Sequence, residues 1–373
     1  MVTYTLHYLR DVHLPQFVHM NLWPSASQGP GSPERAETAI ARLTEVRKAL
    51  RPALFFCNAF GDHLCARPTV LALQAYFGGR LGFIGHPYMA EHFYPDADFR
   101  FVHEIPFVSR DDLTHGFELS DLRKVDDQFD ALISLNPWDS PLVRELPDAI
   151  APRPFIGLNF WYSDVSVLKA DENIIDHTFK LAKLLNPQSS LDRFATLQPR
   201  APLYVHRSRH IRDQLPTGKK VLCVHTETQA YKQWPLDKFR LLINTFLDRH
   251  DNYAVVVVDP TDNDLDVGPF SDRIFSFDQV DVDTATDVLA ACDLFVGIDS
   301  YFMHVADFAR VPTVAIFGET DPRLWGPRFA PHHICRAAKA SEVSVQDVLV
   351  ALEELALRST EVSRASASLE EVD

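Results

Sequence analysis

The sequence predicts an α/β protein with two doubly wound parallel-sheet domains. Its 373 residues are too many for one ordinary hydrophobic core and suit two. Apolar runs of strand length recur along the chain, such as Leu54 to Cys57 and Leu294 to Ile298. Each run is followed by a polar turn and then by a helical pattern, an order that gives parallel strands with helices between them. The two halves of the chain therefore follow the same plan.

The stretch from Cys292 to Pro322 carries the strongest pattern. It reads as a strand, a polar turn, a helix and a second strand, Val311 to Phe317. Asp299 and Ser300 supply small polar side chains where the helix begins. Free N–H groups and the positive end of the helix dipole both face outward at such a turn. The pattern therefore predicts a site for a nucleotide diphosphate.

The first half opens in the same way, with a strand, the turn Asn58 to Asp62 and a helix around Pro68 to Tyr76. Further strands are expected at Leu81 to Ile84, Ala131 to Leu135 and Phe155 to Leu158. Polar and aromatic residues at the ends of such strands line the ligand cleft of a doubly wound sheet. The residues expected to contact the acceptor are His63, Asn136, Trp138, Asn159 and Trp161.

The domain boundaries are expected at shifts in composition. Residues 1–200 form the first domain, with an N-terminal extension over residues 1–50, and Arg200 to Lys219 is expected to be a linker rich in basic residues. Residues 218–358 form the second domain, closed by a helix from Val343 to Leu357. Residues 359–373 mix Ser, Ala and Glu without apolar periodicity, which predicts a disordered tail.

Composition excludes several classes of partner. The chain has 36 basic and 51 acidic residues, a net charge of −15, which argues against nucleic acid. It lacks the roughly 18 to 20 uninterrupted apolar residues of a membrane span, and Arg10 and Asp11 stand where a signal peptide would be apolar. A cytoplasmic protein without a transmembrane segment is expected. Its 5 cysteines include no Cys-x-x-Cys pair, which predicts buried free thiols.

Four segments resemble glycosyltransferase family 9, whose best-known members are the ADP-heptose:lipopolysaccharide heptosyltransferases. They are Gly61-Asp62 before a Pro-bearing helix, Lys232 to Pro235, Gly297 to His304, and Phe317 to Pro322, in the family's order. The resemblance implies a GT-B fold, with two Rossmann-like domains facing a cleft. It also implies an inverting transfer of a sugar, first of all heptose from ADP-heptose, to an acceptor hydroxyl.

The same resemblance implies two catalytic residues. Asp62 would be the general base that removes a proton from the acceptor hydroxyl. Lys232 would neutralise the leaving diphosphate, without a metal ion. Other readings stay open: Asp62 as a helix cap, His63 as the base in its place, and Lys232 as an ordinary solvated lysine.

The donor site implied by the resemblance lies in the second domain. Backbone amides from Ser300 to Met303 would hold the diphosphate, and Asp259 is placed near a ribose by position alone. Glu227 and Tyr301 stand where the family often has Thr and usually has Gly, so other nucleotide-sugars stay open. The full predicted set is Thr226, Thr228, Asp259, Asp299, Ser300, Tyr301, Phe302, Met303, His304 and Thr320.

No metal or cofactor is expected besides the nucleotide-sugar. The pairs Asp262/Asp264 and Asp281/Asp283 resemble metal-binding Asp-x-Asp motifs, but both stand in acidic, turn-like stretches. The acceptor would be a glycan or small molecule, with a soluble one favoured over lipopolysaccharide core because of the net charge, unless a basic patch from Arg207 to Arg212 offsets it. Two alternatives remain: a GT-B-fold sugar-nucleotide epimerase, and a non-catalytic sugar-nucleotide-binding protein.

Overall fold

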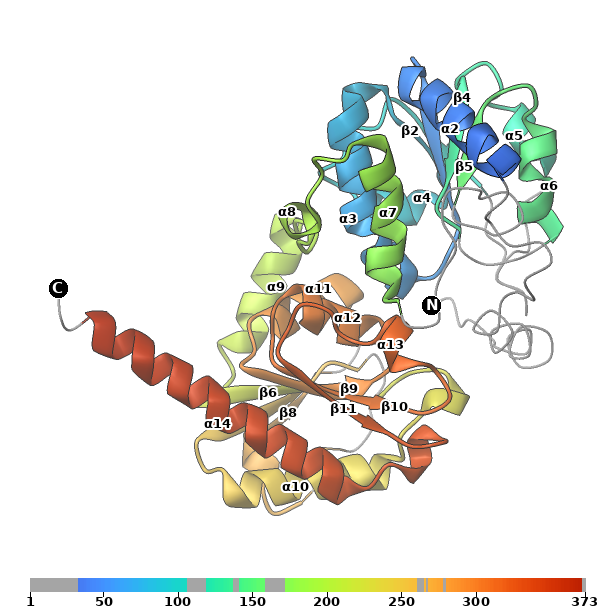
Figure 1. The fold of residues 1–373 in the computed structure, drawn as a ribbon. Helices are drawn as coiled ribbons and strands as arrows, with labels where there is room; N and C mark the ends of the chain where they lie inside the picture. The colour runs from blue at the N-terminus through green and yellow to red at the C-terminus, as the bar shows by residue number, and fades with distance from the viewer. Residues whose placement is uncertain are drawn as a thin grey trace. The chain divides into compact units, whose positions relative to one another are not determined.

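The computed structural model describes residues 33–105, 119–136, 141–157, 172–259, 265, 268–277 and 280–370. The chain divides into two compact units, Met1–Gln198 and Pro199–Asp373. Each unit is a parallel sheet with helices packed on it (Figure 1). The prediction of two doubly wound α/β domains is therefore confirmed. Among the described helices, none is long and apolar enough to cross a membrane.

The sheet of the first unit has five parallel strands in the order β3-β2-β1-β4-β5. Leu54 of β1 pairs with Phe83 on one side and Ile133 on the other. The first strand, β1, lies in the middle of the sheet. The chain adds β2 and β3 on one side of it and β4 and β5 on the other, so the direction of winding reverses between β1 and β4. The strands are β1 (Pro52–Phe56), β2 (Gly82–Gly85), β3 (Val102–Glu104), β4 (Ala131–Ser134) and β5 (Phe155–Gly157).

Helices bury both faces of this sheet. Phe55 belongs to an apolar cluster with Leu122 of α5 and Leu146 of α6, whereas the ring of the next residue, Phe56, contacts His63 of α3 at 4.5 Å. This alternation is expected of a strand covered on both sides. The helices are α2 (Pro33–Lys48), α3 (Phe60–Phe77), η2 (Gly78–Arg80), α4 (Pro87–Phe93), α5 (Leu119–Arg123), α6 (Pro141–Ala149), α7 (Ile174–Leu185) and α8 (Leu191–Phe194).

The sheet of the second unit has six parallel strands in the order β11-β10-β9-β6-β7-β8. Its first strand, β6, lies between β7 and β9, so the winding reverses between β6 and β9. Ligands of open α/β sheets bind outside the carboxyl ends of the strands at such a point. The strands are β6 (Lys220–His225), β7 (Tyr253–Val257), β8 (Ile274–Ser276), β9 (Leu294–Ile298), β10 (Thr313–Phe317) and β11 (His332–Arg336).

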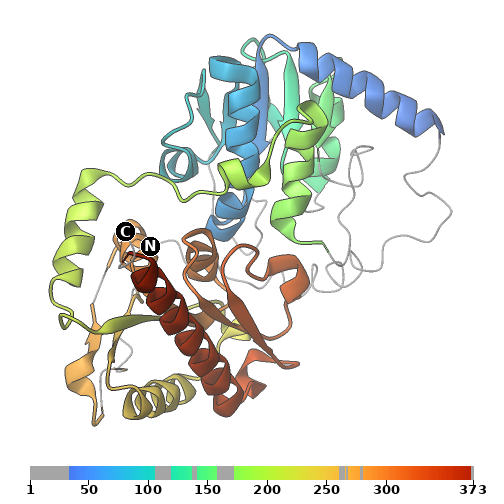
Figure 2. The ribbon, with the colours of Figure 1, turned by 60° about the vertical axis from the view of Figure 1, so that its left-hand side comes forward.

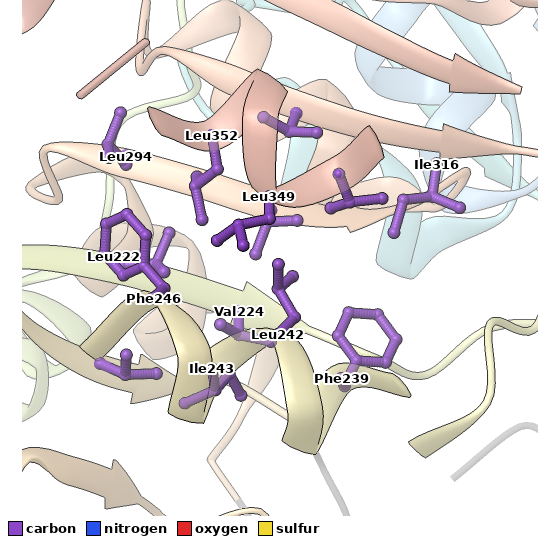
Figure 3. Packing of buried hydrophobic residues seen from close by; sticks show 14 of the residues in the cluster. Leu222, Val224, Phe239, Leu242, Ile243, Phe246, Leu294, Ile316, Leu349 and Leu352 are labelled. Carbon is purple, nitrogen blue, oxygen red and sulfur yellow. The ribbon is translucent and has the colours of Figure 1, made fainter. Parts of the chain in front are cut away.

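The core of this unit lies between the sheet and two helices, α10 and α14. Leu242 of α10 and Leu352 of α14 pack with Val224 and Leu294 of the strands (Figure 3). Each such side chain contributes about 1.5–3 kcal/mol when fully buried. The helices are α9 (Pro202–Arg212), η3 (Ala230–Lys232), α10 (Leu236–Arg249), η4 (Ser271–Arg273), α11 (Val282–Ala290), α12 (Tyr301–Phe308), α13 (Pro322–Trp325), η5 (Ala340–Glu342) and α14 (Val345–Glu370).

The predicted linker is a helix. Most of it forms α9, which packs on α11 of the second unit through two ion pairs, Arg200–Asp283 (3.1 Å) and Arg207–Asp281 (3.0 Å). Asp281 also caps α11 by accepting a hydrogen bond from the Thr284 amide (2.9 Å). Two of the basic residues that suggested a linker therefore pair with acidic side chains. The Asp281/Asp283 pair has partners other than a metal.

The two ends of the chain also differ from the prediction. Residues 33–48, assigned to an extension, form α2, which packs within the first unit; next to it, Arg80 donates a hydrogen bond to the Ala49 carbonyl oxygen (2.9 Å). Helix α14 continues to Glu370, past the predicted end at Leu357, so the prediction of a disordered tail from residue 359 is wrong up to that point (Figure 2, dark red). Residues 359–370 contain no Gly or Pro to stop a helix.

Candidate functional site

Three loops of the second unit meet at the point where its sheet reverses. One follows β6 and carries Lys232, and one follows β9 and carries Asp299. These strands are direct neighbours, with His225 opposite Gly297 at their carboxyl ends. The third loop follows β10, the next strand along, and carries Thr320. The topology therefore brings together Lys232, predicted to be catalytic, with Asp299 and Thr320, predicted to bind the donor.

An ion pair joins the first two loops. The Nζ atom of Lys232 lies 2.7 Å from Oδ2 of Asp299, whose side chain is only 6% exposed. Burial alone would raise the pKa of Asp299, but the Lys232 charge and hydrogen bonds from Lys232 and Thr320 bring that pKa below its usual value. Asp299 is thus ionised at neutral pH and holds the lysine in place. This geometry disfavours the reading of Lys232 as an ordinary solvated lysine.

Hydroxyl and amide groups that can donate hydrogen bonds lie in the same loops as Lys232 and Asp299. The Thr228 hydroxyl donates to the backbone oxygen of Asp299 (3.1 Å), which ties the two loops together. Ser300 precedes α12 but its side chain does not cap the helix. Its hydroxyl is buried and has no hydrogen-bond partner within the described part of the chain. The amides of the first helical turn and this hydroxyl are groups that suit an anionic ligand.

The side chains that follow Ser300 face the interior. Met303 is fully buried, and the Phe302 ring packs on His225 at 4.5 Å. Phe302 and Met303 are therefore suited to bind a nucleotide-sugar through their backbone groups and not through their side chains. Burial lowers the pKa of His304, against the opposing charges of Asp299 and Asp307. A neutral His304 offers a phosphate a hydrogen bond and no charge.

Two predicted donor contacts are engaged inside the protein. Oδ1 of Asp259 accepts a hydrogen bond from the Thr226 amide (2.9 Å), and Oδ2 accepts one from the Thr226 hydroxyl (2.7 Å). Nδ1 of His225 lies 2.7 Å from Oδ1. Burial would raise the pKa of Asp259, and the neighbouring His225 and Thr226 lower it. These bonds give Asp259 and Thr226 a role in fixing the start of the loop, and their contacts with the donor stay predictions.

The Tyr301 side chain contacts α11 and the next residue of its own helix. Its hydroxyl lies 3.2 Å from the Thr286 hydroxyl of α11, and its ring meets that of Phe302 at 5.2 Å. This side chain stands where the family usually has glycine, and its predicted contact with the donor stays a prediction. The structure supports a packing role against α11.

We therefore expect Tyr301→Phe to leave the preference among nucleotide-sugars unchanged while lowering the free energy of unfolding by about 0.5–1.5 kcal/mol, the usual contribution of one hydrogen bond. Urea denaturation measures the stability, and competition kinetics with two nucleotide-sugars measures the preference. A double-mutant cycle with Thr286→Val isolates the bond. A shift in donor preference at unchanged stability would contradict the packing role.

Tyr231 is a neighbour of the ion pair that the sequence analysis missed. Its ring centre lies 5.6 Å from Nζ of Lys232. Burial raises the pKa of the Tyr231 hydroxyl, although the Lys232 charge opposes this. The side chain therefore stays neutral and packs against the stem of the lysine. Its place directly before Lys232 in the sequence was the one signal available.

Asp62 of the first unit stands at the carboxyl end of β1, in the first turn of α3. Its Oδ2 accepts a hydrogen bond from the amide of Ala59 (3.2 Å), the residue that caps the helix. The capping role considered for Asp62 is therefore partly present, at the third helical residue and not at the cap itself. The side chain remains partly exposed, as a general base must be.

Two of the other residues predicted to contact the acceptor substrate are buried. His63 is fully buried, with Nδ1 2.9 Å from the Tyr94 hydroxyl, and burial, aided by the charges of two nearby histidines, lowers its pKa to about 3. It is a core residue, and its burial argues against the alternative in which His63 is the base. Asn136 is also buried and accepts a hydrogen bond from the Cys57 amide (3.2 Å), linking the ends of β4 and β1. The other three residues, Trp138, Asn159 and Trp161, lie outside the described residues.

Two doubly wound parallel sheets in one chain are the architecture of the GT-B glycosyltransferases. The family described as "Glycosyltransferase family 9 (heptosyltransferase)" matches residues 153–348. The chain therefore belongs to glycosyltransferase family 9, and the resemblance found in its motifs is confirmed. No curated protein sequence matches it.

Solved structures support the fold. The family 9 glycosyl transferase from Veillonella parvula DSM 2008 is 15% identical, with a TM-score of 0.63 over 84% of this chain and 99% of the other. E. coli ADP-heptose lps heptosyltransferase II is 16% identical, with a TM-score of 0.59 over 83% of this chain and 99% of the other. The E. coli heptosyltransferase WaaC with ADP is 18% identical, with a TM-score of 0.56 over 82% of this chain and 99% of the other. The GT-B fold spans most of the chain.

Proposed function

We propose that this protein transfers a heptose from ADP-heptose to a hydroxyl group of an acceptor, with inversion at the anomeric carbon. The observation that carries the proposal is the Lys232–Asp299 ion pair at the reversal point of the second sheet. It holds a cation beside the amino-terminal turn of α12, where a leaving diphosphate needs positive potential. A metal ion is not required for this neutralisation.

The chemistry is a single in-line displacement. Asp62 removes the proton from the acceptor hydroxyl, and that oxygen forms a bond to the anomeric carbon. The bond from this carbon to the diphosphate oxygen breaks, and the electron pair leaves with the diphosphate. Lys232 and the amides of the α12 turn stabilise the charge that develops there.

The choice of ADP-heptose draws on the related structures. One E. coli heptosyltransferase structure contains ADP and another contains ADP-2-deoxy-2-fluoro heptose. The family match is described as heptosyltransferase. Glu227 still distinguishes this loop from relatives with Thr at that position, so the donor must be tested directly.

The test measures ADP release and glycoside formation by the purified full chain with ADP-heptose, and with UDP- and GDP-sugars for comparison. We expect ADP-heptose to give acceptor-dependent release of ADP, undiminished by excess EDTA. Preference for a different nucleotide-sugar would overturn the donor assignment. Activity lost to EDTA and restored by Mg²⁺ or Mn²⁺ would overturn metal independence, and binding without turnover would favour the non-catalytic alternative.

A further inference from the structure

Three aromatic side chains gather at the carboxyl ends of β1 and β2. Phe60 begins α3, and Tyr88 and His92 lie one turn apart on α4. The rings of Tyr88 and His92 are stacked, with centroids 5.3 Å apart and planes 17° apart. The Phe60 ring lies 5.7 Å from Tyr88 and 5.5 Å from His92. We call these three residues the aromatic platform.

The platform rests on a rigid base. Phe93 is fully buried and meets the rings of Phe60 (5.5 Å) and His92 (4.5 Å) edge to face. His92 is itself buried beneath Tyr88, which is 44% exposed. An exposed aromatic ring held in place by stacking presents apolar surface at little cost in conformational entropy, a common feature of binding sites.

The platform lies beside the candidate base. Phe60 and Asp62 both belong to the first turn of α3, separated by about 3 Å along the helix axis. The Asp62 charge also acts on Tyr94, the residue that follows α4. Side chains two residues apart on a helix do not face each other, so a molecule that stacked on the platform would reach the Asp62 carboxylate by extending around the first turn of α3.

Among the described residues, the loops after β1 and β2 offer no cation to a phosphorylated ligand. Residues 57–63 and 86–94, which follow β1 and β2, contain no Lys or Arg. Arg67 of α3 donates to the Phe93 carbonyl oxygen, but its side chain is fully buried and paired with the Asp96 carboxylate (2.6 Å). The arginines that precede the strands lie at the opposite, amino-terminal edge of the sheet, where backbone oxygens or carboxylates bind them; Arg80, for example, donates to the Ala49 carbonyl oxygen (2.9 Å). These arginines are Arg51, Arg80, Arg100 and Arg153.

We propose that the aromatic platform binds an uncharged sugar ring of the acceptor, with the apolar C–H face of that ring on Tyr88 and Phe60. Sugars present such faces, and aromatic faces, which carry partial negative charge, attract them. The acceptor of this enzyme is then a neutral glycan or glycoside and not a phosphorylated one. This inference rests on the proposed function, because it makes the stacked sugar the carrier of the hydroxyl that Asp62 deprotonates.

Ligand-observed saturation-transfer NMR on the full chain tests the platform. The probes are methyl β-D-glucoside, methyl β-D-galactoside and methyl α-D-mannoside, with glucose 6-phosphate as the charged comparison. We expect at least one neutral glycoside to bind more tightly than glucose 6-phosphate. Tyr88→Ala should weaken that binding by roughly two- to twelve-fold, the effect of one aromatic contact.

The matched control is Tyr76→Ala, which removes a partly exposed tyrosine at the far end of α3. It should leave glycoside binding unchanged. Calorimetry with ADP should give the same affinity for both variants and the wild type, which shows that the second unit is intact. Tighter binding of glucose 6-phosphate, or equal glycoside binding by Tyr88→Ala and the wild type, would overturn the proposal.

The same experiment separates this inference from the proposed function. If ADP-heptose is not a donor but the neutral glycosides bind through Tyr88, the proposed donor is wrong and the platform stands. If ADP-heptose is consumed with an acceptor while Tyr88→Ala leaves glycoside binding unchanged, the platform is wrong and the proposed function stands.

Discussion

Replacing Lys232 by alanine is expected to lower the rate of sugar transfer by about 10²–10³, the usual effect of removing one group that stabilises transition-state charge. The diphosphate would leave without the cation that the loop after β6 holds 2.7 Å from Asp299. Single-turnover kinetics with saturating ADP-heptose measures the loss. A variant that kept more than about a third of wild-type turnover would contradict the role of Lys232.

This substitution should also destabilise the protein. Breaking a buried ion pair by removing one partner costs about 3–5 kcal/mol, and we expect the lower end because Lys232 is 19% exposed. Without Lys232, burial raises the pKa of Asp299, so the loss is greatest where Asp299 is ionised and diminishes as the pH falls and the carboxylate takes up a proton. Urea denaturation between pH 4 and pH 8 would show this dependence.

A second variant distinguishes the two effects. Lys232→Ala combined with Asp299→Asn removes the uncompensated charge, so it should recover much of the stability but none of the rate. Lys238→Ala is the matched lysine control, since its amine donates to the carbonyl oxygens of Ser341 (2.7 Å) and Val343 (2.8 Å) in the same unit. It should keep full activity. Recovery of turnover by the double variant would mean that Lys232 serves only to balance Asp299.

The strand, turn and helix patterns predicted both sheets because fully buried parallel strands leave a clear apolar signal. The family resemblance singled out Lys232 and Asp299, and the sheet order of the structure shows that the strands before them, β6 and β9, are neighbours. What the patterns did not give was the partner of each polar side chain. Thr226 resembles a phosphate ligand in sequence, and only the fold shows that Asp259 engages it 33 positions away.

The errors share this physical origin. A basic segment was taken for a linker because its partners, such as Asp281 for Arg207, are distant in sequence. His63 was considered as a base because the sequence does not show that it is buried. Its contact with Tyr94 arises only when the chain folds α4 against α3. The aromatic platform was missed for the same reason: Phe60 and Tyr88 become neighbours only when β1 and β2 pair.

Asp62→Asn is expected to lower the transfer rate by about 10²–10⁴, the usual contribution of a general base. The substitution keeps the shape of the side chain, and the amide oxygen of asparagine can still accept the hydrogen bond from the Ala59 amide. The fold of α3 should therefore be preserved. Donor affinity, measured by calorimetry with ADP, should not change, because the candidate donor residues lie in the second unit.

The chain supplies a matched control for this variant in Asp176. It is the third residue after the N-cap Asn173 of α7, as Asp62 is the third after the N-cap Ala59 of α3. Asp176→Asn thus removes the same favourable charge at a helix N-terminus, about 0.3–1 kcal/mol, without touching the candidate site. We expect it to keep turnover within about two-fold of the wild type. If both variants lost activity to the same degree, or if Asp62→Asn kept more than about a third of it, Asp62 would be a helix-capping residue only, because a carboxylate that removes the acceptor proton has no substitute in an amide.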